Sequence, residues 1–143
     1  MKKRGLGIVL IIMLVLVIPG TINCSCAGDN PAGEIEETIT AYVQAYASKD
    51  ATAMLDLQTT AYTASLSGGH QTYWENRWGD NTDSITELEV TIVYQNATVA
   101  TASAICNIKT TLPNGSTWYQ GSWQWNYTLV KTDKVWLISS EIR

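Results

Sequence analysis

The sequence of 143 residues contains no phenylalanine, one histidine and three cysteines. One histidine and three cysteines without a recognisable ligand spacing argue against the common zinc sites. Proline and glycine together account for 13 residues, which excludes collagen-like and low-complexity classes. Hydrophobic residues make up 45% of the chain and charged residues 15%, so it is too apolar to be disordered. We therefore expect one globular domain with no metal and no cofactor.

Basic residues are scarce beyond the first four positions. Lys2, Lys3 and Arg4 precede a long apolar run, whereas residues 24–143 carry six basic and 13 acidic residues, a net charge of −7. Proteins that bind nucleic acid present a basic surface to the phosphate backbone. The charge distribution therefore argues against a nucleic-acid partner.

The apolar run near the N-terminus is short. Leu6–Ile18 holds 13 residues without a polar side chain, and Pro19 and Gly20 follow it. As a helix these residues would rise about 20 Å, less than the roughly 30 Å hydrocarbon core of a bilayer. A basic start, a short apolar core and a helix breaker are typical of a secretory signal. We therefore expect residues 1–27 to be a signal peptide or membrane anchor, and residues 28–143 to form an exported domain.

Three fates of this segment stay open. It resembles a bacterial lipoprotein signal, in which Cys24 would become the lipidated first residue, although Thr21 and Asn23 depart from the usual lipobox. Signal peptidase could instead cut after Ala27, or residues 1–27 could persist as an uncleaved anchor. Each outcome places the domain outside the cytoplasm, either secreted or held at the cell surface or on the periplasmic side of a membrane.

Helical patterns occupy the first half of the domain. Asp50 is placed to cap a short helix, and Tyr73–Trp78 has the i, i+4 pairing of another; Thr59–Leu66 is ambiguous. Apolar residues at the helical period predict a longer, amphipathic helix over 33–48: Ile35, Ile39, Tyr42, Val43 and Tyr46.

From Ser84 onward the hydrophobic period changes to two, which indicates strands. Asn114-Gly115 is a strong hairpin signal, and Gly121 suggests a bulge or bend. Four strand patterns follow one another, at 84–94, 98–111, 118–131 and 135–142. One face of the second carries small side chains, which let a helix approach closely: Ala100, Ala102, Ala104 and Cys106. Helices followed by a run of hairpin strands predict an α+β fold, with N-terminal helices packed on a bent four-stranded antiparallel sheet.

Both ends of this pattern resemble a known superfamily. A helix over 33–48 runs through Ser48-Lys49-Asp50 into a shorter one, and Tyr127–Lys131, a turn at Asp133 and Val135–Ile138 close the chain. This order resembles the nuclear transport factor 2-like superfamily, which includes the SnoaL-like proteins. The resemblance implies a cone-shaped, cystatin-like roll with a pocket. Members include isomerases, dehydratases, cyclases, small-molecule binders and dimerising domains, so the resemblance leaves the function open.

Tryptophan and tyrosine are unusually frequent, with six and seven residues. Both bury a large ring and keep one polar group. Trp118 lies near a hairpin, where we expect it to be exposed. The other tryptophans, including Trp136, either fill the core or line a pocket. We take six aromatic residues as candidate ligand-binding residues: Tyr42, Tyr46, Trp74, Trp78, Trp123 and Trp125.

No catalytic set of residues is visible in the sequence. Our first hypothesis is therefore a non-enzymatic, membrane-anchored domain that binds a small apolar ligand or a protein partner through an aromatic concavity. The alternative is a small SnoaL-like enzyme of the isomerase or dehydratase type. It would use Tyr42 or Tyr46 as the electrophile and His70 or Asp50 as the acid–base group. A third hypothesis is a module that forms homodimers through the outer surface of the sheet.

Overall fold

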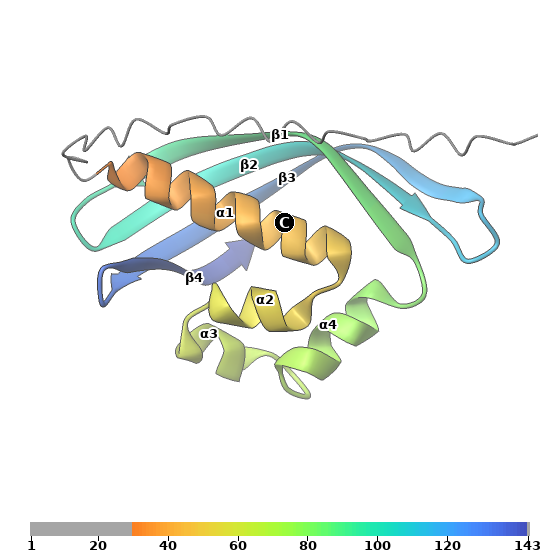
Figure 1. Ribbon diagram of the computed structural model, residues 1–143, viewed down its shortest axis with the longest axis horizontal. Coiled ribbons are helices and arrows are strands. Elements are labelled where there is room, and N and C mark those ends of the chain that lie inside the picture. The colour runs from red at the N-terminus through yellow and green to blue at the C-terminus, as the bar shows by residue number, and fades with distance from the viewer. Residues whose placement is uncertain (1–29, 143) are drawn as a thin grey trace, which may run out of the picture.

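A computed structural model describes residues 30–142 of the chain (Figure 1). Four helices come first: α1 (Pro31–Ser48), α2 (Ala51–Asp56), α3 (Thr60–Ser65) and α4 (His70–Trp78). Four strands follow: β1 (Thr82–Gln95), β2 (Val99–Thr111), β3 (Thr117–Thr132) and β4 (Val135–Ile142). The strands form one antiparallel sheet in the order β1-β2-β3-β4. The predicted α+β architecture is confirmed, and the ambiguous segment forms α3.

The predictions about the leader lie outside the described residues, and this includes lipidation at Cys24. Within residues 30–142, no helix combines the length and the apolar character needed to cross a bilayer. Secretion, cleavage and anchoring therefore stay predictions.

Side-chain caps define where the first two helices begin. The Asn30 side chain accepts a hydrogen bond from the Gly33 amide at 3.2 Å, and Pro31 opens α1. Lys49 ends α1 in the left-handed conformation, with φ 59°. Asp50 accepts from the Ala53 amide at 2.9 Å and thereby caps α2, as the sequence predicts.

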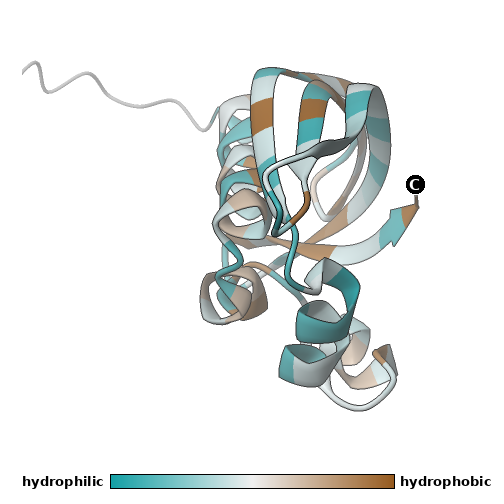
Figure 2. Cartoon of the chain, turned by 90° about the vertical axis from the view of Figure 1, so that its right-hand side faces the viewer, coloured by the Kyte–Doolittle hydropathy of each residue, from teal (hydrophilic) through white to brown (hydrophobic). Residues whose placement is uncertain are grey.

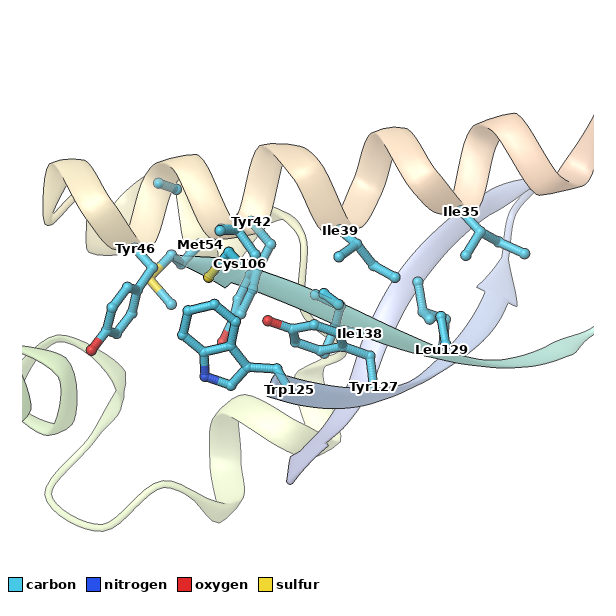
Figure 3. Packing of buried hydrophobic residues seen from close by; sticks show 14 of the residues in the cluster. Ile35, Ile39, Tyr42, Tyr46, Met54, Cys106, Trp125, Tyr127, Leu129 and Ile138 are labelled. Atoms are coloured by element: carbon cyan, nitrogen blue, oxygen red, sulfur yellow. The ribbon is translucent and has the colours of Figure 1, made fainter. Parts of the chain in front are cut away.

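The core lies between α1 and the sheet. Ile35 and Ile39 point from α1 toward Leu129 on β3, and all three side chains are fully buried (Figure 3). The small-residue face of β2 is buried over its whole length, as predicted: Ala100, Ala102, Ala104 and Cys106. Seen from the side of α4, the strands bend into an arch with α1 along one side (Figure 2).

The alternation of faces along β1 is interrupted twice. Ile92 pairs with Ala102, but Tyr94 pairs with Thr101, so the register shifts by one residue between them. An earlier shift falls between Thr86 and Glu89. Strict alternation along the predicted strand would place Tyr94 on the apolar face with Ile92, and this expectation is wrong, because the second shift turns the Tyr94 side chain outward, where it is 53% exposed.

The sequence suggests a bulge at Gly121, but the bulge in β3 lies at Trp118. Thr110 pairs with Tyr119 and Thr111 with Thr117, which leaves Trp118 as the extra residue, whereas Gly121 pairs regularly. Glycine is needed there for another reason. A Cβ atom at Gly121 would lie 2.8 Å from the hydroxyl oxygen of Tyr119, which crosses over it to reach the Ser122 carbonyl oxygen at 3.1 Å.

Different helices and turns lie at the two ends of the molecule (Figure 1). The start of α1 lies beside the β1–β2 turn and the tight β3–β4 turn of Asp133 and Lys134, both of which have positive φ. The Lys131 ammonium contacts the Glu34 carboxylate there at 3.0 Å. We call this the N-terminal end. The β2–β3 turn and α4 lie at the opposite end, which we call the α4 end.

Candidate functional site

The six candidate aromatic residues form one connected cluster. Tyr46 lies at its centre, with its ring centroid 5.9 Å from Trp74, 6.0 Å from Trp78 and 5.9 Å from Trp125. Edge-to-face contact also joins Tyr42 to Trp74 at 6.4 Å, and Trp123 stacks on Trp125 at 6.1 Å. The fold thus brings together side chains from α1, α4 and β3 that are far apart in the sequence.

A pocket of about 170 Å³ opens beside this cluster at the α4 end. Three of the six candidates line it, namely Tyr46, Trp78 and Trp123. The bulged Trp118 adds a fourth aromatic wall and is 68% exposed, as the sequence predicts. The remaining lining residues are Arg77, Asn81, Asp83, Ile108 and Thr110. The pocket therefore combines aromatic walls with one residue of each charge.

The other three candidates lie behind the pocket. Tyr42, Trp74 and Trp125 are at most 2% exposed, and none of them lines the pocket at the α4 end. Their rings support the pocket wall, since Trp74 and Trp125 both contact Tyr46. These three side chains are buried in the core, and ligand binding stays a prediction for all six residues.

Polar groups of the pocket are held in defined positions. The buried Thr110 hydroxyl donates to the Asp83 carboxylate at 2.6 Å, which orients that carboxylate. A guanidinium nitrogen of Arg77 lies 3.4 Å from the hydroxyl of Tyr73, one turn earlier on α4. The Trp78 indole N–H is buried and has no hydrogen-bond partner among residues 30–142. A buried donor without a partner is costly in a folded protein.

Sequence reasoning missed a buried polar network around Tyr42. The Tyr42 hydroxyl donates to the Glu141 carboxylate at 3.0 Å and accepts from the Gln58 amide at 2.8 Å. Burial raises the pKa of Tyr42 far above its ordinary value of 10.0, and the negative charge of Glu141 raises it further. The phenol is therefore a firmly protonated donor with a carboxylate as its acceptor.

The sequence does not predict the inward orientation of Glu141, because this orientation depends on a bulge in β4. Strict alternation from Trp136 and Ile138 would place Glu141 on the outer face of β4. The register shifts at Ser139, however, so Glu141 pairs with the inward-facing Tyr127. Gln58 follows the end of α2 and forms an isolated bridge with Ile138. Neither position carries a signal in a single sequence.

Asp50 and His70, the acid–base candidates of the enzyme hypothesis, lie outside the network around Tyr42. Asp50 is exposed and caps α2. His70 opens α4 and lies against Trp74, with ring centroids 6.4 Å apart. Burial lowers the pKa of His70 below its ordinary value, which favours the neutral ring. Neither residue lines the pocket at the α4 end that Tyr46 borders.

A second cavity, of about 360 Å³, lies at the N-terminal end between α1 and β4. It is lined by Glu34, Glu37, Thr38, Ala41, Leu57, Lys134, Val135 and Trp136. Its one aromatic wall, Trp136, is outside the aromatic cluster defined above. Among residues 30–142 no three histidine, cysteine or carboxylate side chains come together in a way that could hold a metal ion.

Comparison with solved structures shows which fold these elements build. A ketosteroid isomerase-like protein from Erwinia carotovora atroseptica superposes with a TM-score of 0.63. The match covers 80% of this chain and 95% of that chain at 16% identity. The chain has the fold of ketosteroid isomerase-like proteins.

The same fold occurs in proteins with other descriptions. An uncharacterised protein with a cystatin-like fold from Caulobacter vibrioides matches with a TM-score of 0.54 and 12% identity over 77% of this chain and 85% of that chain. The association domain of C. elegans CaMKII matches with a TM-score of 0.53 and 16% identity. This match covers 78% of this chain and 92% of that chain. No protein-family model and no curated protein matches the sequence. These likenesses establish the fold and leave the function to the site.

Proposed function

We propose that the chain is an exported domain, held at a membrane through its N-terminus, that binds a small ligand in the pocket at the α4 end. The observation that carries this proposal is the placement of four aromatic residues around one pocket: Tyr46, Trp78, Trp118 and Trp123. Trp118 supports it most directly, because a tryptophan that is 68% exposed contributes little to the core.

The position of the pocket also fits an anchored protein. The chain enters the described domain at Asn30, at the N-terminal end, whereas α4, whose last residue Trp78 lines the pocket, lies at the opposite end (Figure 1). A pocket remote from the point of entry would stay open to the solution if the chain before Asn30 were held at a membrane.

Intrinsic tryptophan fluorescence tests ligand binding. The full chain in detergent micelles is titrated with small cyclic alcohols, ketones and glycosides, and we expect at least one to shift the emission. Trp123→Ala should weaken that binding about tenfold or more, since it removes a wall of the pocket. Trp136→Phe, a change at the opposite end, serves as the control and should leave the affinity unchanged. A chain whose emission responds to no member of the set would contradict the proposal.

Attachment at Cys24 requires a separate test. Cells that express the full chain are labelled with a palmitate analogue, and we expect the label in the wild type and in Cys26→Ser but not in Cys24→Ser. Cys26→Ser is the matched control because it changes a neighbouring thiol. Label retained in Cys24→Ser would rule out lipidation there. Mass spectrometry of the mature N-terminus then separates cleavage after Ala27 from an uncleaved anchor.

Self-association through the outer face of the sheet is a second candidate. The outward side chains of β2 and β3 are mostly uncharged: Thr101, Ser103, Ile105, Asn107, Ser122, Gln124 and Asn126. Ile105 is 44% exposed in the middle of this face. Analytical ultracentrifugation should show a dimer that Ile105→Lys dissociates, because a buried unpaired charge is costly. A wild type that sediments as a monomer at high concentration would reject this candidate.

A further inference from the structure

The polar groups of the pocket narrow the class of ligand, and this step rests on the proposed function. Four aromatic residues line it, but Arg77, Asn81 and Asp83 line it too. A purely apolar ligand would displace water from these polar groups and offer them no hydrogen bond in return. We propose that the pocket takes a single polyhydroxylated ring, such as the terminal unit of a glycan, and not a wholly apolar molecule.

The charges favour a neutral ligand that both donates and accepts hydrogen bonds. Arg77 offers several N–H donors, and no carboxylate of residues 30–142 forms an ion pair with it. Asp83 offers acceptors, and its contact with Thr110 at 2.6 Å leaves carboxylate lone pairs available. An anionic ligand would meet Asp83 and a cationic one Arg77. Hydroxyl groups, which donate and accept, satisfy both residues.

Asn81 adds to this pattern. It lines the pocket, and its side chain has a donor and an acceptor. A ring that carries several hydroxyl groups presents acceptors and donors at close spacing around its edge.

The exposed Trp118 provides the platform for such a ring. The face of an indole carries partial negative charge, and the C–H groups on one face of a sugar ring carry partial positive charge. The bulge in β3 places this side chain at the pocket while it stays 68% exposed. The volume of about 170 Å³ is below the range of about 300–1,000 Å³ that drug-sized ligands occupy, which suits one ring.

The experiment compares rings that differ in their polar groups. The full chain in micelles is titrated with methyl glycosides of glucose, mannose and N-acetylglucosamine, with cyclohexanol and with cyclohexanecarboxylate. We expect one glycoside to bind with a Kd on the order of 1 mM and at least tenfold more tightly than both cyclohexane compounds. Asp83→Asn and Trp118→Ala should each weaken that binding about tenfold or more, because they remove a charged acceptor and the stacking face.

Matched controls separate the pocket from general effects. Asp56→Asn changes an exposed carboxylate on α2, and Tyr94→Ala changes an exposed aromatic residue of β1; both should bind like the wild type. Tighter binding of cyclohexanol or cyclohexanecarboxylate would overturn the sugar proposal and leave the proposed function standing. Glycoside binding that neither Asp83→Asn nor Trp118→Ala weakens would overturn it too. The absence of binding by every compound would overturn both proposals.

Discussion

The N-terminal end and the α4 end of the molecule are built from different side chains. Between α1 and the sheet at the N-terminal end, the core is aliphatic and wholly buried, with Ile35, Ile39 and Leu129 at 0% exposure (Figure 3). At the α4 end the corresponding layer is aromatic. Each end has a cavity with charged residues in its lining, but Trp136 is the one aromatic residue that lines the cavity at the N-terminal end, whereas four aromatic residues line the pocket at the α4 end.

This difference indicates that the two halves of α1 have different roles. The first half of α1 contributes to stability, because its buried residues contact other buried aliphatic residues. The second half carries Tyr46, which is 8% exposed and lines the pocket. Substitutions at the N-terminal end should therefore change the free energy of unfolding, whereas substitutions at the α4 end should change ligand affinity.

The largest effect on stability is expected from Ile39→Ala. Removal of a fully buried isoleucine leaves a cavity between α1 and β3 and should lower the free energy of unfolding by about 2–5 kcal/mol. Urea denaturation followed by circular dichroism measures this. Val93→Ala is the control, since Val93 is 71% exposed, and it should cost about 1 kcal/mol or less. Equal losses in the two variants would contradict the assignment of the core.

Tyr42→Phe should have the next largest effect, because it deprives the Gln58 amide and the Glu141 carboxylate of a partner. We expect a loss of about 1–3 kcal/mol at pH 7. The wild type should also lose stability above about pH 10. There the unfolded chain releases the Tyr42 proton, whereas burial raises the pKa and keeps this proton in the folded chain.

Denaturation curves between pH 7 and pH 11 test this pH dependence. Stability should fall less steeply with pH in Tyr42→Phe than in the wild type, because the variant lacks the group whose pKa differs between the two states. Tyr94→Phe, which alters a tyrosine that is 53% exposed, provides the control and should follow the wild type. Identical slopes in Tyr42→Phe and the wild type would show that the network does not hold the proton.

Lys131→Met tests a weaker contact at the N-terminal end. The ammonium lies 3.0 Å from Glu34 and 5.5 Å from the centroid of the Trp136 ring, and both carboxylate and ammonium are partly exposed. Methionine keeps the apolar stem, so the loss should be about 0.5–1 kcal/mol. High salt should reduce this difference. Lys109→Met, at an exposed lysine, is the control and should leave the free energy of unfolding unchanged. A larger loss of stability in Lys109→Met than in Lys131→Met would contradict a stabilising contact at Lys131.

Trp118→Ala should have the smallest effect on stability. Its side chain is 68% exposed, so the free energy of unfolding should change by about 0.5 kcal/mol or less. The same variant should weaken ligand binding, which is the reverse of the expected behaviour of Ile39→Ala. Denaturation and fluorescence titration of both variants test the contrast. A destabilised Trp118→Ala with unchanged affinity would break the comparison between the two ends.

Most elements of the fold follow from local patterns. The helical period from Ile35 to Tyr46 predicts α1, and the pattern from Val135 onward predicts β4 with the observed bounds. The small residues of β2 predict the buried face of the sheet. Asp50 has the position and chemistry of a cap, and the structure uses it as one. These features depend on neighbours along the chain, which the sequence displays.

The candidate site follows from the sequence only in part. The abundance of tryptophan and tyrosine points to an aromatic cluster, and the six chosen residues do meet in one. Which of them border a pocket depends on how α4 and β3 are placed around Tyr46 of α1, an arrangement of distant segments. Trp118 was expected to be exposed, and the structure adds that the bulge in β3 brings it to the pocket.

By itself, the sequence determines the order of helices and strands, the acidic character of the domain and the aromatic composition of its interior. The tertiary structure alone decides which side chains share a face once a strand contains a bulge. A bulge is a shift of register between two paired strands, and a shift of one residue reverses every later side chain. At Ser139 such a shift turns Glu141 toward Tyr42, and at Trp118 another completes the pocket wall.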